Sequence, residues 1–441
     1  MIDSGTTAWL LVSAALVMLM TPGLAFFYGG MSRAKSVLNM MLMSFASIAI
    51  VSVLWVLVGH SLTYADGAGP LTPVIGGLGD AGLGGMVGEV DPEGGYPLLV
   101  DAGFQMMFAV ITVALISGAI ADRAKFGAWL LFVPVWSLLV YFPVAHWVWG
   151  GGWVSSLDIG GTEVVDFAGG TAVHINAGAA ALALTVVLGR RKGFGAESMR
   201  PHNLPFVLLG VALLWFGWFG FNAGSAYAAD ETAALALVNT QVATAAATGA
   251  WMLVERLRQG RVSALGFASG AVAGLVAITP AAADLTPLGA TLLGLVAGGV
   301  CAYTISLKFR FGYDDALDVV GIHLVGGIIG ALAIGFLAAP VAGDSSGLLY
   351  GGEFHLLLVQ GIALVGVAVY SFAVTYVVGK AIDAVMGFRI PEAVETNGLD
   401  HEIHSETAYA FAELDHLADG AEELSASTPP GAETAERGVR S

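Results

Sequence analysis

Two stretches of the chain place an aspartate eight residues ahead of a histidine inside an otherwise apolar segment. One runs from Asp166 to His174 and the other from Asp315 to His323. An ionisable side chain in hydrocarbon is energetically costly, so it rarely lies there without a partner or a function. The similar settings of the two pairs, one in each half of the chain, predict a paired site near the middle of a membrane.

The chemistry of such a site depends on whether His174 and His323 meet. Two adjacent imidazoles cannot both be protonated cheaply in a low-dielectric environment. They would stay neutral, one ring donating a hydrogen bond and the other accepting it, which suits a small neutral substrate or a proton relay. A zinc site is a poorer interpretation because two histidines without a third ligand make an incomplete set. We therefore expect neither a metal nor another cofactor. In the plainest alternative, each histidine is a buried polar residue bonded to a backbone carbonyl.

Composition gives the class of protein that must position these residues. Of 441 residues, 56% are hydrophobic and 12% charged, with a mean hydropathy of +0.79. Soluble proteins carry about 25% charged residues. We expect an all-α, multi-pass protein of the cell membrane, in contact with the lipid bilayer. A net charge of −17 without a basic patch excludes nucleic-acid binding. No nucleophile–base set or phosphate loop indicates an enzyme.

Eleven apolar segments are long enough to be transmembrane helices. Each is near the roughly 20 residues that a hydrocarbon core of about 30 Å requires. They cover residues 8–29, 38–60, 98–121, 127–148, 167–189, 204–224, 233–254, 264–280, 287–307, 317–338 and 355–379.

The Lys and Arg residues predict the orientation of these segments. All 17 follow an odd-numbered segment, and the alternate loops contain none. Because cytoplasmic loops are enriched in Lys and Arg, the N-terminus is expected outside and the C-terminal tail in the cytoplasm. Ten or twelve crossings would scatter the basic residues across both faces.

Five crossings begin on one side of the membrane and end on the other. Segments 1–5 and segments 6–10 therefore start on opposite sides and are inverted relative to each other. Inverted repeats are a common transporter architecture, with the site at the midplane between the halves. We expect a first five-helix repeat at 1–190, a second at 201–345, an eleventh helix at 354–380, a cytoplasmic regulatory tail at 381–417 and a disordered acidic C-terminus at 418–441.

This inversion brings the two histidines to one depth. A helix rises about 1.5 Å per residue, so each histidine lies about 12 Å beyond its aspartate. His174 is reached from the outer boundary and His323 from the inner one, so the rings arrive at nearly the same level of a core about 30 Å thick. We expect them to touch.

An Asp ahead of an apolar helix is a good N-cap. We expect Asp315 to act mainly as a helix cap. Asp166 faces the outside, so it could act either as a cap or by attracting a cation with its charge.

Aromatic residues collect at the expected outer ends of several segments. Trp215-Phe-Gly-Trp-Phe-Gly-Phe-Asn-Ala-Gly-Ser225, Phe104-Gln-Met-Met-Phe108 and His146-Trp-Val-Trp149 are the main groups. Such residues often form only an interfacial belt. Glycine beside them leaves the ring faces accessible, and a tryptophan with a hydroxyl at the mouth of a channel would bind a small cation.

Several long motifs occur in one order along the chain. They are FYGGMSRAKSVLNMM, FQMMFA, VWGGGW, DFAGGTAVH, WFGFNAGSA, DDALDVVGIHLVGG and FRIPEAVETNGLDHEIHSETAY. In these motifs the chain resembles the ammonium transporter (Amt) family, of the bacterial and archaeal type, over nearly its whole length. The resemblance implies transport of ammonium or methylammonium by a homotrimer with one pore in each protomer.

The resemblance also implies how the outer part of each pore is built. Trp149, Phe108 and Ser225 look like the external recruitment site for ammonium. Phe108 and Phe221 look like the stacked rings that close the pore below that site, and Trp218 looks like the aromatic residue that braces them.

Deeper residues follow from the same resemblance. Asp166 looks like the acidic residue associated with binding and deprotonating the cation. His174 and His323 look like the family's twin histidines, and Leu115 and Val319 like residues along the apolar pore. Ammonium would lose its proton near the stacked rings, and ammonia would pass the histidines.

The tail motif resembles the family segment that contacts PII-type regulatory proteins, so we expect such a partner at the cytoplasmic face. An ammonium sensor that signals through the tail is the main alternative, although the tail lacks the pattern of a fused signalling domain. An ion-coupled symporter is less well supported, because no Gly/Pro-interrupted helix pair marks a sodium site.

Overall fold

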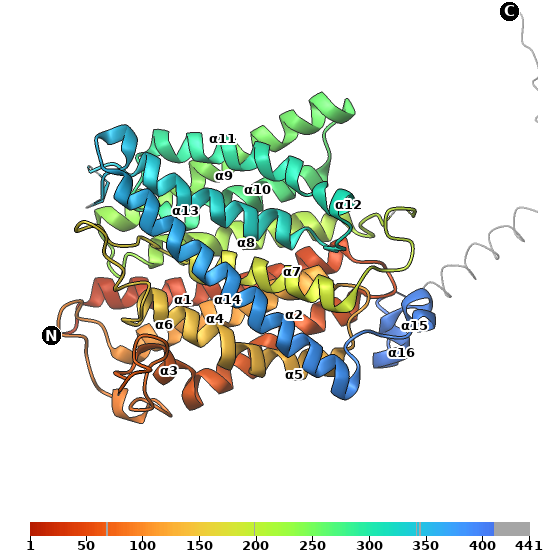
Figure 1. Cartoon of the computed structure of the whole chain (residues 1–441), viewed down its shortest axis with the longest axis horizontal. Coiled ribbons are helices and arrows are strands. Elements are labelled where there is room, and N and C mark those ends of the chain that lie inside the picture. Colours follow the sequence, from red (N-terminus) through yellow and green to blue (C-terminus); the bar gives the residue numbers. More distant parts are fainter. Residues whose placement is uncertain (68, 198, 341, 344, 410–441) are drawn as a thin grey trace, which may run out of the picture.

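The chain folds into a bundle of long helices (Figure 1). The computed structural model describes residues 1–67, 69–197, 199–340, 342–343 and 345–409, and no β-strand occurs in these ranges. The elements are α1 (Ser4–Met31), α2 (Val37–Leu54), η1 (Trp55–Gly59), α3 (His60–Tyr64), η2 (Gly84–Met86), α4 (Leu98–Ile116), η3 (Ser117–Ile120), α5 (Phe126–Trp136), η4 (Ser137–Tyr141), α6 (Phe142–Trp149), η5 (Gly170–Ile175), α7 (Asn176–Leu188), α8 (Leu204–Gly224), α9 (Glu231–Gln259), α10 (Ala264–Ile278), η6 (Thr279–Ala281), α11 (Pro287–Thr304), α12 (Leu307–Phe311), η7 (Val320–Leu324), α13 (Val325–Leu337), η8 (Leu348–Tyr350), α14 (Phe354–Met386), α15 (Glu392–Asn397) and α16 (Leu399–His404).

Ten helical stretches of the described chain are long and apolar enough to cross a membrane. They are α1, α2–α3, α4–η3, α5–α6, η5–α7, α8, α10–η6, α11–α12, η7–α13 and α14. They coincide with ten of the eleven expected segments. The chain is therefore a multi-pass membrane protein, as composition predicted.

The remaining expected segment, 233–254, lies within α9, which has 29 residues but is too polar to be counted among the ten. Four of its polar residues, Asn239, Thr240, Thr244 and Thr248, are buried, and Asn239 donates to the carbonyls of Ala282 and Leu285 at 2.9 and 2.6 Å. α9 packs along α10 and α11 (Figure 1). Part of the low hydropathy of α9 thus comes from a face that contacts other helices. The eleventh crossing stays a prediction.

The N-terminus and the short helices α15 and α16 lie at opposite ends of the bundle (Figure 1). Arginines from several loops meet at the α15–α16 end. Arg33 and Arg191 both pair with Asp122, at 3.3 and 3.2 Å, and Arg191 also forms a two-pronged pair with Asp314. Basic residues that follow the first and fifth segments therefore lie on one side of the bundle.

The tail closes over this end through two buried carboxylates. Glu395 pairs with Arg389 at 2.8 Å and accepts the backbone N–H of Lys192 at 2.7 Å. Asp400 accepts the N–H groups of Leu38 and Asn39, at 3.0 and 2.9 Å, and so caps the start of α2. The described part of the expected tail ends at residue 409, so residues 410–417 and the expected disordered segment 418–441 lie outside it.

Each histidine of the sequence-predicted pair lies in a π-helical turn, His174 in η5 and His323 in η7. The two broken helices pack through glycines four residues beyond each histidine. A Cβ on Gly178 would lie 2.5 Å from the backbone nitrogen of Leu324, and a Cβ on Gly327 would lie 3.1 Å from the carbonyl oxygen of Gly170. A side chain at either position would push the elements apart, so these glycines set the separation of the histidines.

Candidate functional site

A cavity of about 220 Å³ lies beside the outer aromatic residues of the bundle. It is lined by Tyr64, Gln105, Phe108, Trp149, Phe167, Ser225 and Tyr227. Three of the four expected recruitment residues therefore line one hollow: Phe108 from α4, Trp149 from the end of α6, and Ser225 just past α8.

The polar atoms of this cavity are oriented by the backbone. The hydroxyl of Ser225 donates to the carbonyl of Phe221 at 2.8 Å, which leaves the oxygen free to accept from a ligand. The indole N–H of Trp149 donates to the carbonyl of Asp166 at 3.0 Å. Trp149 and Phe108 meet edge to face, with centroids 6.1 Å apart at 86°. The cavity thus offers a hydroxyl acceptor and aromatic rings, the combination that suits a small cation with N–H groups.

Asp166, the fourth expected recruitment residue, does not line the cavity. Its two carboxylate oxygens accept four backbone N–H groups, from Gly169, Gly170, Thr171 and Ala172, at 2.6–3.0 Å. It therefore caps η5 and holds Trp149 through its own carbonyl. Any effect of its charge on a cation must act across this turn, not by direct contact.

Phe108, which lines the cavity, packs against a second phenylalanine ring. Phe108 and Phe221 have centroids 4.2 Å apart at 31°, and both side chains are buried. Trp218 packs against Phe221 at 5.3 Å and stacks on His174 at 5.3 Å and 19°. Its indole N–H donates to the hydroxyl of Thr279 at 2.9 Å. The stack brings together Phe108, Phe221 and Trp218, the three residues that were expected to close the pore and are called the gate below. It also links them directly to His174.

His174 and His323 face each other behind the gate. Their Nδ1 atoms are 3.2 Å apart, and both side chains are buried. One Nδ1 must carry the proton and the other must accept it, because two protonated or two unprotonated nitrogens would repel at this distance. The Nε2 atom of His174 has no hydrogen-bond partner in the protein. By this argument the two rings share one proton between their Nδ1 atoms, and Nε2 of His174 is left without a partner.

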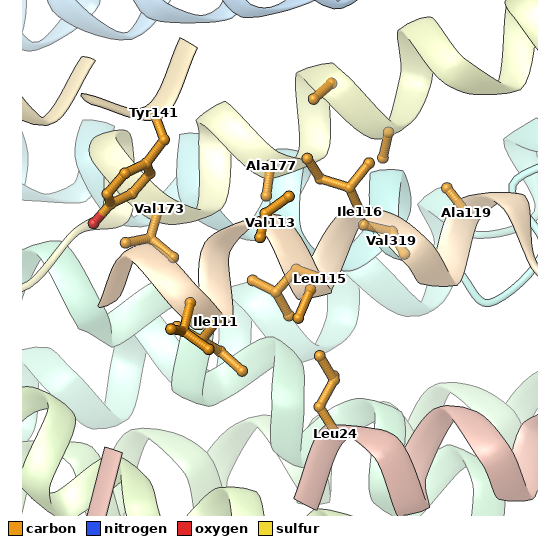
Figure 2. Close-up of a cluster of buried hydrophobic side chains, with 14 of the residues drawn as sticks. Leu24, Ile111, Val113, Leu115, Ile116, Ala119, Tyr141, Val173, Ala177 and Val319 are labelled. Carbon is orange, nitrogen blue, oxygen red and sulfur yellow. The ribbon is translucent and has the colours of Figure 1, made fainter. Parts of the chain in front are cut away.

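The remaining expected pore residues lie in an apolar cluster. Leu115 of α4 and Val319, which directly precedes η7, belong to one buried group together with Leu24 of α1 (Figure 2). Apolar side chains of this kind have nothing to replace the hydration of an ion.

Asp315 holds the start of η7 as Asp166 holds that of η5. Its carboxylate accepts the N–H groups of Val319 and Val320 at 3.0 and 2.7 Å, and Lys308 donates to its carbonyl at 2.9 Å. In the described ranges no group of three His, Cys, Asp or Glu side chains is arranged to hold a metal.

Five residues that line the cavity or support the gate received no function from the sequence: Gln105, Tyr64, Phe167, Tyr227 and Thr279. Gln105 carries the clearest sequence signal of the five, since it is a polar residue inside an apolar segment next to Phe104. The other four reach the site by tertiary packing, which local patterns do not show.

Comparison with known proteins gives consistent matches over nearly the whole chain. A family model described as Ammonium Transporter Family matches residues 8–409. The ammonium transporter of Mycobacterium tuberculosis H37Rv is 51% identical over 444 residues, covering 93% of this chain and 91% of that protein. Ammonium transporter Amt1 of Archaeoglobus fulgidus is 44% identical, covering 92% and 100%.

Solved structures match as well. Mep2 of Candida albicans has a TM-score of 0.81 at 32% identity, covering 89% of this chain and 87% of that one. A structure described as a sensor Amt protein has a TM-score of 0.82 at 26% identity, covering 90% and 98%.

Proposed function

The chain belongs to the ammonium transporter family, and we propose that it recruits ammonium at the outer cavity, deprotonates it at the Phe108–Phe221 gate and conducts ammonia past the paired histidines. One observation supports this proposal. The Phe108 ring lines the outer cavity and packs on Phe221, and Phe221 in turn stacks on His174, which faces His323.

Recruitment follows from the donors and acceptors of the cavity. Ammonium brings four N–H donors and a full positive charge. The Ser225 oxygen accepts one N–H, and the rings of Trp149 and Phe108 attract the charge, so part of the lost hydration is replaced.

Deprotonation follows from the change of environment at the gate. Burial of a cation without a counter-charge disfavours the charged form, so an ammonium ion that leaves the cavity becomes more acidic. Its N–H bond then breaks by proton transfer to water on the outer side of the gate, which leaves hydronium there while ammonia moves on. The negative charge of Asp166, held by four N–H groups behind Trp149, favours the cation on the outer side only. Potassium has no proton to lose, so the apolar pore excludes it.

The same family membership supports the expected topology. Eleven crossings, with α9 as the seventh, would place the N-terminus and the helices α15 and α16 on opposite sides of the membrane, in agreement with their positions at opposite ends of the bundle. The N-terminus would be external, and the arginine-rich end that carries α15 and α16 would be cytoplasmic.

A homotrimer and a PII-type partner at the α15–α16 end are part of the proposal and rest on the family resemblance. A sensor function is the second candidate, since one related structure is described as a sensor Amt protein. Signalling output in cells that depends on α15 and α16 but persists when transport is blocked would favour the sensor.

The test compares His174→Ala and His323→Ala with the unmodified protein in proteoliposomes. Methylammonium uptake should be saturable in the unmodified protein, and each substitution should change its rate or its discrimination against potassium. Leu332→Ala, in the same helix as His323 but outside the site, is the control. Unchanged uptake and unchanged potassium rejection in both histidine variants would contradict the role given to the pair.

A further inference from the structure

Three side chains form a hydrogen-bonded network that extends from the carboxylate of Asp101 to the outer cavity. The hydroxyl of Tyr227 lies 2.7 Å from Oδ1 of Asp101, and Nε2 of Gln105 lies 2.6 Å from the same hydroxyl. Gln105 and Tyr227 line the cavity, whereas Asp101, in the first turn of α4, does not. None of the three was assigned a function by the sequence patterns.

The carboxylate of Asp101 determines which group donates and which accepts in each hydrogen bond of this network. An ionised carboxylate only accepts, so the single proton of the Tyr227 hydroxyl is donated to Asp101. The Tyr227 oxygen must then accept from Gln105, and this requires the NH₂ side of the amide to face the tyrosine. Oε1 of Gln105 is consequently turned away from Tyr227, and it has no hydrogen-bond partner in the protein.

Tyr227 is held in an unfavourable backbone conformation to reach this position. Its φ is +57°, in the left-handed region that a bulky residue seldom adopts. Strain of this kind persists only where the surroundings fix it, and it is concentrated at functional sites. Its ring also packs on Phe104 and Tyr96, at 5.8 and 5.7 Å, which holds the hydroxyl between Asp101 and Gln105.

We propose that Asp101 and Tyr227 orient Gln105 so that its carbonyl oxygen accepts an N–H of the bound ammonium ion. Gln105 is then a second acceptor beside Ser225 and a binding residue, while Tyr227 and Asp101 are positioning residues. If the amide were turned the other way it would present its NH₂ group, which would repel the cation. The charge of Asp101 adds to the attraction. This inference rests on the proposed function, because it assumes that the cavity takes ammonium.

The test measures KM and maximal rate for ammonium-driven uptake by proteoliposomes carrying Gln105→Leu, Tyr227→Phe or Asp101→Asn. Removal of a hydrogen bond to a charged ligand should raise KM about tenfold in Gln105→Leu, with little change in maximal rate. Tyr227→Phe and Asp101→Asn should raise KM by a smaller factor, and the Tyr227→Phe/Gln105→Leu double variant should match Gln105→Leu alone. Glu93→Gln removes an exposed acidic charge in the loop that precedes α4 and should leave KM unchanged.

A purely structural role predicts a different result. It would lower thermal stability or maximal rate without a selective rise in KM, and the effects of Tyr227→Phe and Gln105→Leu would add. Saturable uptake by the unmodified protein with unchanged KM in all three single variants would overturn the inference and leave the proposed function intact. If the unmodified protein shows no saturable uptake, the proposed function and the inference both fail. Should Asp101→Asn not fold, Tyr227→Phe, which lacks only one oxygen, and Gln105→Leu decide the question.

Discussion

Phe108 and Phe221 lie between two environments that favour different forms of the same small molecule. In the proposed mechanism, the Ser225 oxygen and the ring of Trp149 stabilise a cation on one side, and the paired histidines on the other side are buried and neutral. The aromatic rings cannot hydrate an ion, so the proposal requires that a proton stays behind before passage. At the residue scale, the proposed function depends on this change across one pair of rings.

Trp149→Leu should raise KM for ammonium about tenfold, because the cation loses its attraction to the indole face. The indole N–H bond to Asp166 is also lost, but Asp166 keeps its four backbone partners, so the helix start should survive. Uptake kinetics in proteoliposomes check the prediction. An unchanged KM would show that Trp149 is only part of an interfacial belt.

At the scale of elements, the site depends on two helices that begin with a capping aspartate and a π-helical turn. η5 and η7 each carry a histidine, and Gly178 and Gly327 let the two elements approach closely. The π-turn changes the direction of the side chain within the helix, which is common where a helix carries a functional residue. The spacing of the histidines is thus determined by backbone packing.

Gly178→Ala should lower both thermal stability and transport, because its Cβ would lie 2.5 Å from the nitrogen of Leu324. Overpacking of this kind costs about 1–3 kcal/mol. Gly361→Ala in α14 is the matched control, since a Cβ there meets nothing within 4 Å. Thermal unfolding in detergent and uptake assays should separate the two variants. Equal thermal stability and equal uptake in the two variants would contradict the close packing at Gly178.

The sequence predicted that His174 and His323 meet, because hydrophobic length, charge placement and helical rise are local properties. The inversion of the two halves of the chain stays a prediction. It did not predict the π-turns, or that all of the Asp166 carboxylate is used for capping. α9 has a lower hydropathy than the ten other long helical stretches, in part because Asn239 is a polar residue that is buried against Ala282 and Leu285. Asp400 caps α2 from the far end of the chain, a contact that only the tertiary fold creates.

At the scale of the whole molecule, ion pairs tie the loops at one end of the bundle to each other and to the tail. Asp314 receives two bonds from the guanidinium of Arg191, and Arg123 donates to its backbone carbonyl. Glu395 and Asp400 extend the connection to α15 and α16. A partner that binds the tail would therefore act on groups that are joined to the ends of the transmembrane helices.

Asp314→Asn should destabilise the protein by about 3 kcal/mol, because it leaves the buried guanidinium of Arg191 without its main partner. Burial alone would raise the pKa of Asp314, but the hydrogen bonds of Arg191 and the charges of Arg123 and Arg191 lower it below 3.8. The stability from this pair is therefore complete above the unfolded-state pKa and is lost as pH falls through the lower folded-state pKa.

Thermal unfolding as a function of pH checks this prediction. The unmodified protein should lose stability in acid below about pH 4, and Asp314→Asn should lose less over that range. If the thermal stability of the two proteins changed with pH in parallel, Asp314 would be excluded as the group responsible for the loss of stability in acid.

Asp400→Ala should release α16 from the start of α2, since the N–H groups of Leu38 and Asn39 lose their acceptor. Limited proteolysis should then cut near residues 398–405 faster than in the unmodified protein, while Glu402→Gln, an exposed acidic neighbour, should behave as unmodified. Equal cleavage rates for all three proteins would show that Asp400 does not anchor the tail.

The central claim is that ammonium must give up its proton at the gate to enter the pore. Currents on a solid-supported membrane, recorded from the same proteoliposomes after jumps in ammonium and in potassium concentration, test it most directly, with parallel measurement of lumenal pH. Ammonium should give a saturable response in current or pH, and potassium none at any concentration. A potassium current comparable to that of ammonium would contradict the account, because an ion without a proton to lose would then be crossing the same pore.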